Sequence, residues 1–309
     1  MIEIVAQSEA MREAVRLAER VAATDANVLV TGESGAGKDA LAFHIHSSSD
    51  RASQSFVKID CATLPSDLLE AELFGYERGA FTSAHEAKPG RLEAAHKGTL
   101  VLDEIAYLSV DSQAKLLRVI ENREFERLGG RRTIRVDARL IALTNVNLAD
   151  AVKRRDFRED LFYRLNVVHI VIPSLRERSA DLPRLTQSFL KTYAAKHGRE
   201  ISGIASGALS LLKEYEFPGN VRELANTIER AVIISSGKRI EISDLPESVR
   251  AAVHVQRKRR QPLSLAELET EYVAEMLAAT NGNKTEAARI LGISRKNLYE
   301  RLARLDRRR

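Results

Sequence analysis

The 309-residue chain lacks the features that mark secreted, membrane or repeat proteins. Its one cysteine, Cys61, cannot form an internal disulfide, and because no reactive partner is evident we expect a core thiol in a reducing compartment. No run approaches the roughly 18 consecutive apolar residues of a membrane span, and the N-terminal residues Met1-Ile2-Glu3-Ile4 do not begin a secretion signal. Internal repeats and low-complexity tracts are also missing. These absences predict a soluble intracellular protein without a membrane partner.

Charge is spread unevenly along the chain. Lys and Arg number 48 against 43 Asp and Glu, a formal net charge of +5. Residues 251–309 contain 13 basic and 7 acidic residues, so this end carries +6 and the remainder is close to neutral. Apolar residues make up 44%, enough for a core, and the length suggests about two domains. The basic end indicates a polyanionic partner there.

Residues 1–175 alternate short apolar runs with helical periodicity. The runs predict buried strands at residues 28–30, 56–59, 100–102, 140–143 and 167–172. Strands that alternate with helices favour an α/β fold, with a parallel sheet between helices. Residues 123–135 differ because two short runs meet at Gly129-Gly130, which predicts a β-hairpin.

The pattern becomes helical from Pro173 to about Val249, which predicts a helical subdomain. Like charges cluster at residues 257–260 and favour a solvated linker, with DNA contact as the alternative. A compact helical unit follows. The expected domains are an α/β subdomain at residues 1–173, a helical subdomain at 174–250, a linker at 251–263 and a helical domain at 264–309.

A glycine-rich loop lies between the first predicted strand and a helix. Its residues are Gly32, Glu33, Ser34, Gly35, Ala36, Gly37 and Lys38. Glycines let backbone N–H groups converge on phosphate oxygens, and Lys38 adds a positive charge near the β- and γ-phosphates. The alternative, a simple turn before a helix, does not explain the order strand, loop, helix. Asp39 stands where the general pattern has Ser or Thr, so its carboxylate must act on Mg²⁺ indirectly.

Two acids end the third predicted strand. Asp103 would hold Mg²⁺, and Glu104 would orient or deprotonate the attacking water. Alone, such a pair is typical of a helix N-terminus; beside the glycine-rich loop it favours a nucleotide site. Thr144 and Asn145 end the next strand at the same edge of the sheet, where they either sense the γ-phosphate or form an ordinary turn.

Three arginines are candidates for the positive charge that phosphoryl transfer requires. Arg158 and Arg164 are six positions apart and cannot share one helical face. The alternative for this pair is a salt-bridged surface helix. Arg222 follows a Pro-Gly turn at the start of a predicted helix, from which it could reach a nucleotide.

Together these residues resemble the AAA+ domain of bacterial sigma-54-dependent transcription activators, the enhancer-binding proteins. The most specific stretch is residues 70–84, which resembles the family's GAFTGA loop that touches the sigma factor. Its last six residues are Gly79, Ala80, Phe81, Thr82, Ser83 and Ala84. The blocks at residues 173–178 and 217–224 and a Fis-like C-terminus occur in the family's order. The resemblance implies a AAA+ P-loop ATPase with a parallel sheet, a helical lid and a C-terminal all-α helix-turn-helix domain.

The resemblance also implies roles for individual residues. The glycine-rich loop would bind ATP, Asp103 and Glu104 would act on Mg²⁺ and water, and Thr144-Asn145 would be sensor I. Arg222 would be sensor II.

Two further implications concern the assembly. Arg158 and Arg164 match trans-acting arginine fingers, so hydrolysis would depend on self-association into a ring, typically a hexamer. Phe81 and Thr82 would form the tip of a loop that ATP raises toward the sigma-54 RNA polymerase holoenzyme.

Three of the positions that depart from the family's pattern concern the predicted functional sites. Ser83 replaces the second glycine of GAFTGA and removes access to positive φ. Asp60 stands where the family often has an asparagine that restrains the catalytic glutamate, and its carboxylate would repel Glu104 unless one is protonated or a metal intervenes. Asp39 replaces the usual glutamate and is shorter by one methylene.

Many relatives carry a receiver or ligand-sensing domain before the ATPase, whereas here the ATPase-like region begins within about ten residues of Met1. This implies control by a trans-acting regulator, a paralogous subunit or expression level. Alternatively, the sequence is truncated.

The C-terminal residues predict a helix-turn-helix without reference to the family. An apolar stripe over residues 265–277 predicts a first helix, followed by a helix over 285–291 and another from Arg295. Ala288 and Gly292 are small enough for the helices to cross closely, with Leu298 packed beneath. Ser294 is the expected N-cap.

The exposed face of the last helix is expected to bind double-stranded DNA at an upstream activator site. Ser294, Arg295 and Asn297 would lie near base edges. Lys296 and Arg301 would contact phosphates. A solvated three-helix bundle is the alternative, and it leaves the local charge of +6 unexplained. The long first helix suggests dimerisation, with half-sites about 34 Å apart.

The leading hypothesis is an ATP-hydrolysing activator in the bacterial cytoplasm that binds upstream DNA, forms a ring and remodels sigma-54 RNA polymerase. Two alternatives remain. One is a AAA+ regulator that uses ATP only to control its assembly. The other is non-enzymatic: a DNA-binding regulator, or a subunit of a mixed ring whose own site is weak.

Overall fold

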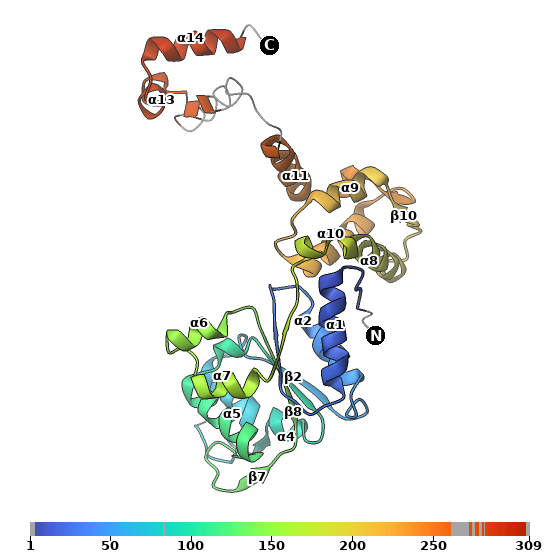
Figure 1. Cartoon of the computed structure of the whole chain (residues 1–309), viewed down its shortest axis with the longest axis vertical. Coiled ribbons are helices and arrows are strands. Elements are labelled where there is room, and N and C mark those ends of the chain that lie inside the picture. Colours follow the sequence, from blue (N-terminus) through green and yellow to red (C-terminus); the bar gives the residue numbers. More distant parts are fainter. Residues whose placement is uncertain are drawn as a thin grey trace. The chain divides into compact units, whose positions relative to one another are not determined.

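The computed structural model describes residues 4–82, 84–260, 272, 273, 276, 277, 280 and 282–306. Ser83 and most of the predicted first helix of the DNA-binding unit lie outside these residues. The chain divides into two compact units, residues 1–250 and 251–309, and each is described by itself (Figure 1). Within the described residues, every helix falls short of the length and apolar character that a bilayer span requires.

A five-stranded parallel sheet lies at the centre of residues 1–250. In spatial order its strands are β2 (Phe56–Asp60), β5 (Thr99–Asp103), β8 (Arg139–Thr144), β1 (Val28–Thr31) and β9 (Val168–Val171). All four pairings are parallel, and Val30 pairs with Leu143 on one side and Ile170 on the other. The five strands predicted from the sequence, and the α/β class, are confirmed.

Helices cover both faces of this sheet, as Figure 1 shows. Val28 and Val30 pack with Leu41 and Ile45 in one core, whereas Leu29 packs in the other. The first core is covered by α1 (Glu9–Ala22) and α2 (Lys38–Ser47). The second is covered by α3 (Ser66–Phe74), α4 (Arg91–Ala94), α5 (Val110–Asn122), α6 (Leu148–Lys153) and α7 (Glu159–Leu165). Burial on both faces explains why the strands are continuous apolar runs.

Two short antiparallel pairs accompany the sheet. β6 (Glu124–Glu126) pairs with β7 (Thr133–Arg135), which confirms the predicted hairpin. β3 (Gly75–Tyr76) pairs with β4 (Lys88–Pro89) and so closes the segment that contains Phe81. The short helix η1 (Ile105–Tyr107) follows the acids at the end of β5.

The residues that follow the sheet form a mainly helical subdomain. Its helices are η2 (Leu175–Asp181), α8 (Leu182–Lys196), α9 (Ser206–Glu214), α10 (Asn220–Ile234) and η3 (Ile242–Asp244). An all-helical prediction is wrong in one respect, because β10 (Gly203–Ile204) pairs in parallel with β11 (Arg239–Ile240). Strands of two residues are too short to leave an alternating pattern. Helix α11 (Glu247–Arg260) continues into the segment expected to be a linker.

The second unit contains α13 (Lys284–Ile290) and α14 (Arg295–Asp306). Ala288 and Leu298 are buried together with Val273, and Gly292 in the turn has a φ of +66°. The Ser294 hydroxyl accepts a hydrogen bond from the Asn297 N–H at 3.2 Å, as an N-cap does. The predicted pair of crossing helices is confirmed.

Candidate active site

The glycine-rich loop joins the end of β1 to the start of α2. Gly35 and Gly37 have φ values of +74° and +109°, which only glycine adopts without strain. The Lys38 side chain is 7% exposed, and its Nζ donates to the carbonyl oxygens of Gly32 at 2.9 Å and Glu33 at 3.4 Å. The loop, this ammonium group and a helix N-terminus therefore lie together, which is the arrangement that binds phosphate.

Glu104 lies beside this loop. Its Oε1 is 3.8 Å from Lys38 Nζ, and its Oε2 accepts a hydrogen bond from the Asn145 backbone N–H at 3.3 Å. The carbonyl oxygen of the buried Thr144 accepts a hydrogen bond from the Gly32 N–H at 3.3 Å. Glu104 has left-handed backbone angles, φ +52° and ψ +48°, an unfavourable conformation for this residue type that is frequent at active sites. The predicted acid, lysine and sensor I residues are thus brought together at one edge of the sheet.

Asp39 and Asp103 contact the same lysine, Lys58, which the sequence pattern did not single out. Lys58 Nζ is 2.7 Å from Asp103 Oδ2 and also contacts the Asp39 carboxylate. Burial lowers the pKa of Lys58, but the hydrogen bonds to Asp103 and Asp39 outweigh it and the net pKa is raised. A polar residue within the apolar run at 56–59 was the only signal in the sequence.

The same pair of carboxylates suits Mg²⁺. They are close enough to share one cation, and Mg²⁺ is typically held by one or two carboxylates together with phosphates and water. Among the residues that the structure describes, His, Cys, Asp and Glu side chains form no group of three or more that could hold a metal by themselves. The donor set therefore fits a metal that arrives with a nucleotide.

The two residues that follow Ile59 have different surroundings. The Asp60 carboxylate accepts a hydrogen bond from the Ala62 N–H at 2.9 Å, so it is turned onto its own loop. Its repulsion of Glu104 stays a prediction. Cys61 is buried in the core, as expected, and burial, with a smaller effect of the nearby acids, raises the pKa of Cys61 to about 12.

The start of α10 contacts the glycine-rich loop. Arg222 Nη1 donates to the Ser34 hydroxyl at 3.1 Å, so the predicted sensor II residue reaches the loop. The neighbouring Asn220 is fully buried; its Nδ2 donates to Glu33 Oε2 at 3.0 Å, and its Oδ1 accepts from the Leu175 N–H at 2.7 Å. The sequence did not predict Asn220 as a site residue, although it lies within the family block at residues 217–224. These contacts tie the helical subdomain to the phosphate loop.

Arg158 and Arg164 lie on the surface of the protomer. Arg158 Nη2 is 2.7 Å from Asp160 Oδ2, and Arg164 Nη2 is 3.0 Å from Glu121 Oε1. The hydrogen bond from Arg158 lowers the pKa of Asp160. Both arginines thus pair with acids outside the glycine-rich loop. They are placed on the exterior, where a residue of another copy can approach.

The predicted sigma-contact loop is described at residues 79–82 and 84. The Gly79 N–H donates to the Ala84 carbonyl at 2.8 Å, which closes the loop. Phe81 packs edge-on against Tyr76 with ring centroids 4.9 Å apart, yet it remains 38% exposed, and Thr82 is also exposed. The tip of the loop is therefore at the surface, as a contact loop requires.

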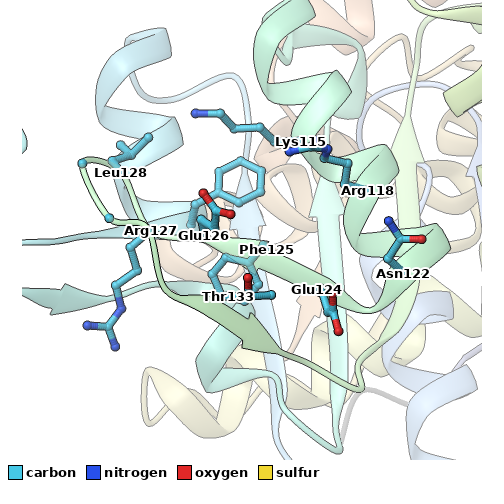
Figure 2. Close-up of a pocket in the computed structure, with 12 residues that line it drawn as sticks. Lys115, Arg118, Asn122, Glu124, Phe125, Glu126, Arg127, Leu128 and Thr133 are labelled. Carbon is cyan, nitrogen blue, oxygen red and sulfur yellow. The ribbon is translucent and has the colours of Figure 1, made fainter.

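The β6–β7 hairpin braces the base of this loop. Arg127 Nη2 is 2.7 Å from Glu93 Oε2 and its Nη1 is 3.1 Å from Glu77 Oε1, while the Glu77 N–H donates to the Leu128 carbonyl at 2.9 Å. The hydrogen bond from Arg127 lowers the pKa of Glu93. Figure 2 shows the hairpin beside α5, where the two elements line a cavity of about 420 Å³. None of the residues assigned to ATP lines this cavity.

The predicted DNA-contacting residues gather on α14 and its N-cap. Ser294, Arg295, Lys296 and Asn297 are exposed. Arg301 Nε donates to Asn297 Oδ1 at 3.0 Å, and Arg295 contacts the Thr285 hydroxyl on α13. One helix therefore presents the whole predicted set.

Comparison with known proteins decides the family. Residues 4–171 match the sigma-54 interaction domain, residues 176–262 match the AAA+ ATPase lid domain, and residues 264–305 match the Fis family of bacterial regulatory proteins. This chain belongs to the sigma-54-dependent transcription activators. The match supports the activator hypothesis over its two alternatives, and the AAA+ class of the fold is confirmed.

Individual relatives of this sigma-54 activator span most of its length. Regulatory protein AtoC of Escherichia coli K12 is 44% identical over 307 residues, which is 97% of this chain and 67% of AtoC. Nitrogen fixation protein VnfA of Azotobacter vinelandii is 45% identical over 307 residues, 98% of this chain and 59% of VnfA. A crystal structure of NtrX from Brucella abortus in complex with ATP has a TM-score of 0.74 and 36% identity, covering 99% of this chain and 69% of NtrX.

Proposed function

We propose that this sigma-54 activator hydrolyses ATP at a site completed by a second copy and uses the reaction to move the Phe81-Thr82 tip against sigma-54 RNA polymerase. One observation carries the proposal. Lys38, Glu104 and Asn145 lie together within one protomer, whereas the arginines needed for the transition state lie on its exterior.

Hydrolysis follows from these positions. The loop N–H groups and Lys38 hold the β- and γ-phosphates. Glu104 accepts a proton from water as the water oxygen bonds to the γ-phosphorus, and the bond to the β–γ bridging oxygen breaks to give ADP and phosphate. Asp103, with indirect help from Asp39, would hold Mg²⁺, which would supply positive charge to the phosphates.

The remaining residues relate the reaction to its surroundings. Thr144 and Asn145 sense the γ-phosphate. The hydrogen bond from the Asn145 N–H to the Glu104 carboxylate links this sensor to the catalytic glutamate. Arg222, as sensor II, responds to the nucleotide in the loop through its hydrogen bond to the Ser34 hydroxyl. Arg158 and Arg164 neutralise transition-state charge across the seam of a ring, for which we propose a hexamer.

At the other end of the chain, the protein dimerises and uses α14 of each copy to bind double-stranded upstream DNA in the bacterial cytoplasm. We also propose domain boundaries at residues 173, 250 and 263. Ser294, Arg295 and Asn297 read bases, while Lys296 and Arg301 hold phosphates.

Two variants test the proposal. Lys38→Ala should abolish phosphate release from ATP, because the phosphates lose the buried ammonium group beside the glycine-rich loop. Thr82→Ala should keep ATP hydrolysis but lose transcription from a sigma-54 promoter. If the unmodified protein hydrolyses ATP and drives no promoter opening, the sigma-54 role is wrong and the assembly-only alternative holds.

A further inference from the structure

Lys58 lies where the cation of the proposed metal site belongs. It is on β2, where it pairs in register with Val101 of the adjacent strand β5. From there its ammonium group is 2.7 Å from Asp103 Oδ2 and also contacts the Asp39 carboxylate on α2. The three side chains come from three separate elements, so the packing of β2, β5 and α2 fixes their meeting point.

This ammonium group balances two negative charges. Two carboxylates that can touch one cation repel each other when no cation is between them. Asp103 is 15% exposed, so water screens that repulsion incompletely. Lysine suits the position because its charge is compact and its four-carbon stem can swing away.

The structure also offers the displaced side chain a place to go. Lys58 lines a cavity of about 570 Å³ together with Asp60, Tyr76 and Phe81. Asp60 is two residues further along the same strand, so the two side chains share one face of the sheet. An ammonium group that leaves Asp103 can therefore remain near the Asp60 carboxylate, in the cavity that Phe81 also lines.

We propose that Lys58 is a positioning residue that holds Asp39 and Asp103 together in the nucleotide-free protein and withdraws when the metal binds. The inference rests on the proposed function in that Asp103 is taken as the ligand of Mg²⁺. Its consequence is that free divalent metal competes with a built-in cation, so that metal binds well only when nucleotide phosphates add their own ligands.

Binding of Mn²⁺ to the nucleotide-free full chain tests this directly. Mn²⁺ shares the oxygen-ligand preference of Mg²⁺, and the free ion is measured from its paramagnetic resonance signal. Lys58→Met should bind Mn²⁺ at least tenfold more tightly than the unmodified protein. Without metal its Tm should be lower by about 2–4 °C, and Mn²⁺ should restore it.

Three further variants control the measurement. Lys88→Met removes a lysine that lines the same cavity but pairs with Glu72, so it should behave as the unmodified protein does. Lys58→Arg keeps the charge and should keep weak Mn²⁺ binding. Lys58→Gln is the neutral variant to use if the methionine variant does not fold.

The outcomes distinguish a failure of the role of Lys58 from a failure of the proposed function. Equal Mn²⁺ affinity and equal melting in the lysine and neutral variants would overturn the role of Lys58. If the unmodified protein binds no nucleotide in the presence of Mn²⁺, the proposed function fails instead, whatever the effect of Lys58 on the free metal.

Discussion

The glycine-rich loop and the surface around α7 hold their positive charges in different ways. Lys38 is 7% exposed and is fixed by carbonyl groups of its own loop, whereas Arg164 is 60% exposed and pairs with Glu121 in a solvated ion pair. Exposed pairs of this kind contribute about 0–1 kcal/mol and are readily exchanged. The contrast supports the proposal that one protomer organises the ground state of the nucleotide, while Arg164 supplies transition-state charge to another copy.

After the Lys38→Ala variant, the largest expected effect comes from removing the exposed charge of Arg164. Arg164→Ala should lower kcat for ATP hydrolysis by about 10³-fold with little change in nucleotide affinity, because an arginine finger acts mainly on the transition state. Phosphate release at saturating ATP measures it. Arg154→Ala is the matched control, since this exposed arginine pairs with Asp156 just before α7.

Mixing two inactive variants sharpens the comparison. Arg164→Ala keeps the acid at residue 104, and Glu104→Gln keeps the arginine. If the arginine acts across a seam, an equimolar mixture should regain activity well above the sum of the separate proteins. A mixture that stays at that sum would place the arginine's action within its own protomer.

A smaller effect is expected where the helical subdomain touches the loop. Asn220→Ala should lower the free energy of unfolding by about 1–3 kcal/mol, because the Leu175 N–H loses its buried acceptor. Nucleotide affinity should fall as well, since Glu33 of the glycine-rich loop loses its hydrogen bond from the residue 220 side chain. Urea unfolding and ADP titration measure the two effects, and Asn226→Ala, an exposed residue of the same helix, should change neither.

The DNA affinity of the C-terminal unit should depend on salt concentration. Affinity for duplex DNA should fall steeply with ionic strength, because bound cations are released from the phosphates. Lys296→Ala should reduce the slope of log affinity against log salt by about one. Fluorescence anisotropy across a salt series measures it, and a flat response would contradict phosphate binding by this face.

The smallest effect concerns Cys61. Burial, helped by the nearby acids, raises its pKa from 9.0 to about 12, so the folded thiol is neutral at pH 8 and should resist alkylation until the protein unfolds. Because the unfolded thiol ionises first, this group should reduce folding stability as pH rises above about 9. Mass spectrometry after iodoacetamide treatment checks the reactivity, and rapid modification of the folded protein would refute the buried assignment.

The sequence predicted what depends on periodicity and local chemistry. Local sequence patterns marked the five strands, the hairpin at Gly129-Gly130 and the crossing helices at Ala288, because residues close in sequence determine these features. Asn220, Lys58 and Arg127 left no such pattern, because each works through partners distant in sequence, as Asn220 does with Leu175. The left-handed backbone of Glu104, at the turn from β5 into η1, was equally unpredictable, since glutamate as a residue type gives no signal for a positive φ.

The most direct test of the central claim is whether the terminal phosphate moves the Phe81 loop. The chain contains no tryptophan, so Phe81→Trp introduces a single fluorescent reporter at the tip. Combined with Glu104→Gln to prevent hydrolysis, it should show a red-shifted emission with MgATP, as the ring leaves Tyr76 for solvent, and the nucleotide-free spectrum with MgADP. Identical spectra with MgATP and MgADP, at concentrations where both are bound, would contradict the account.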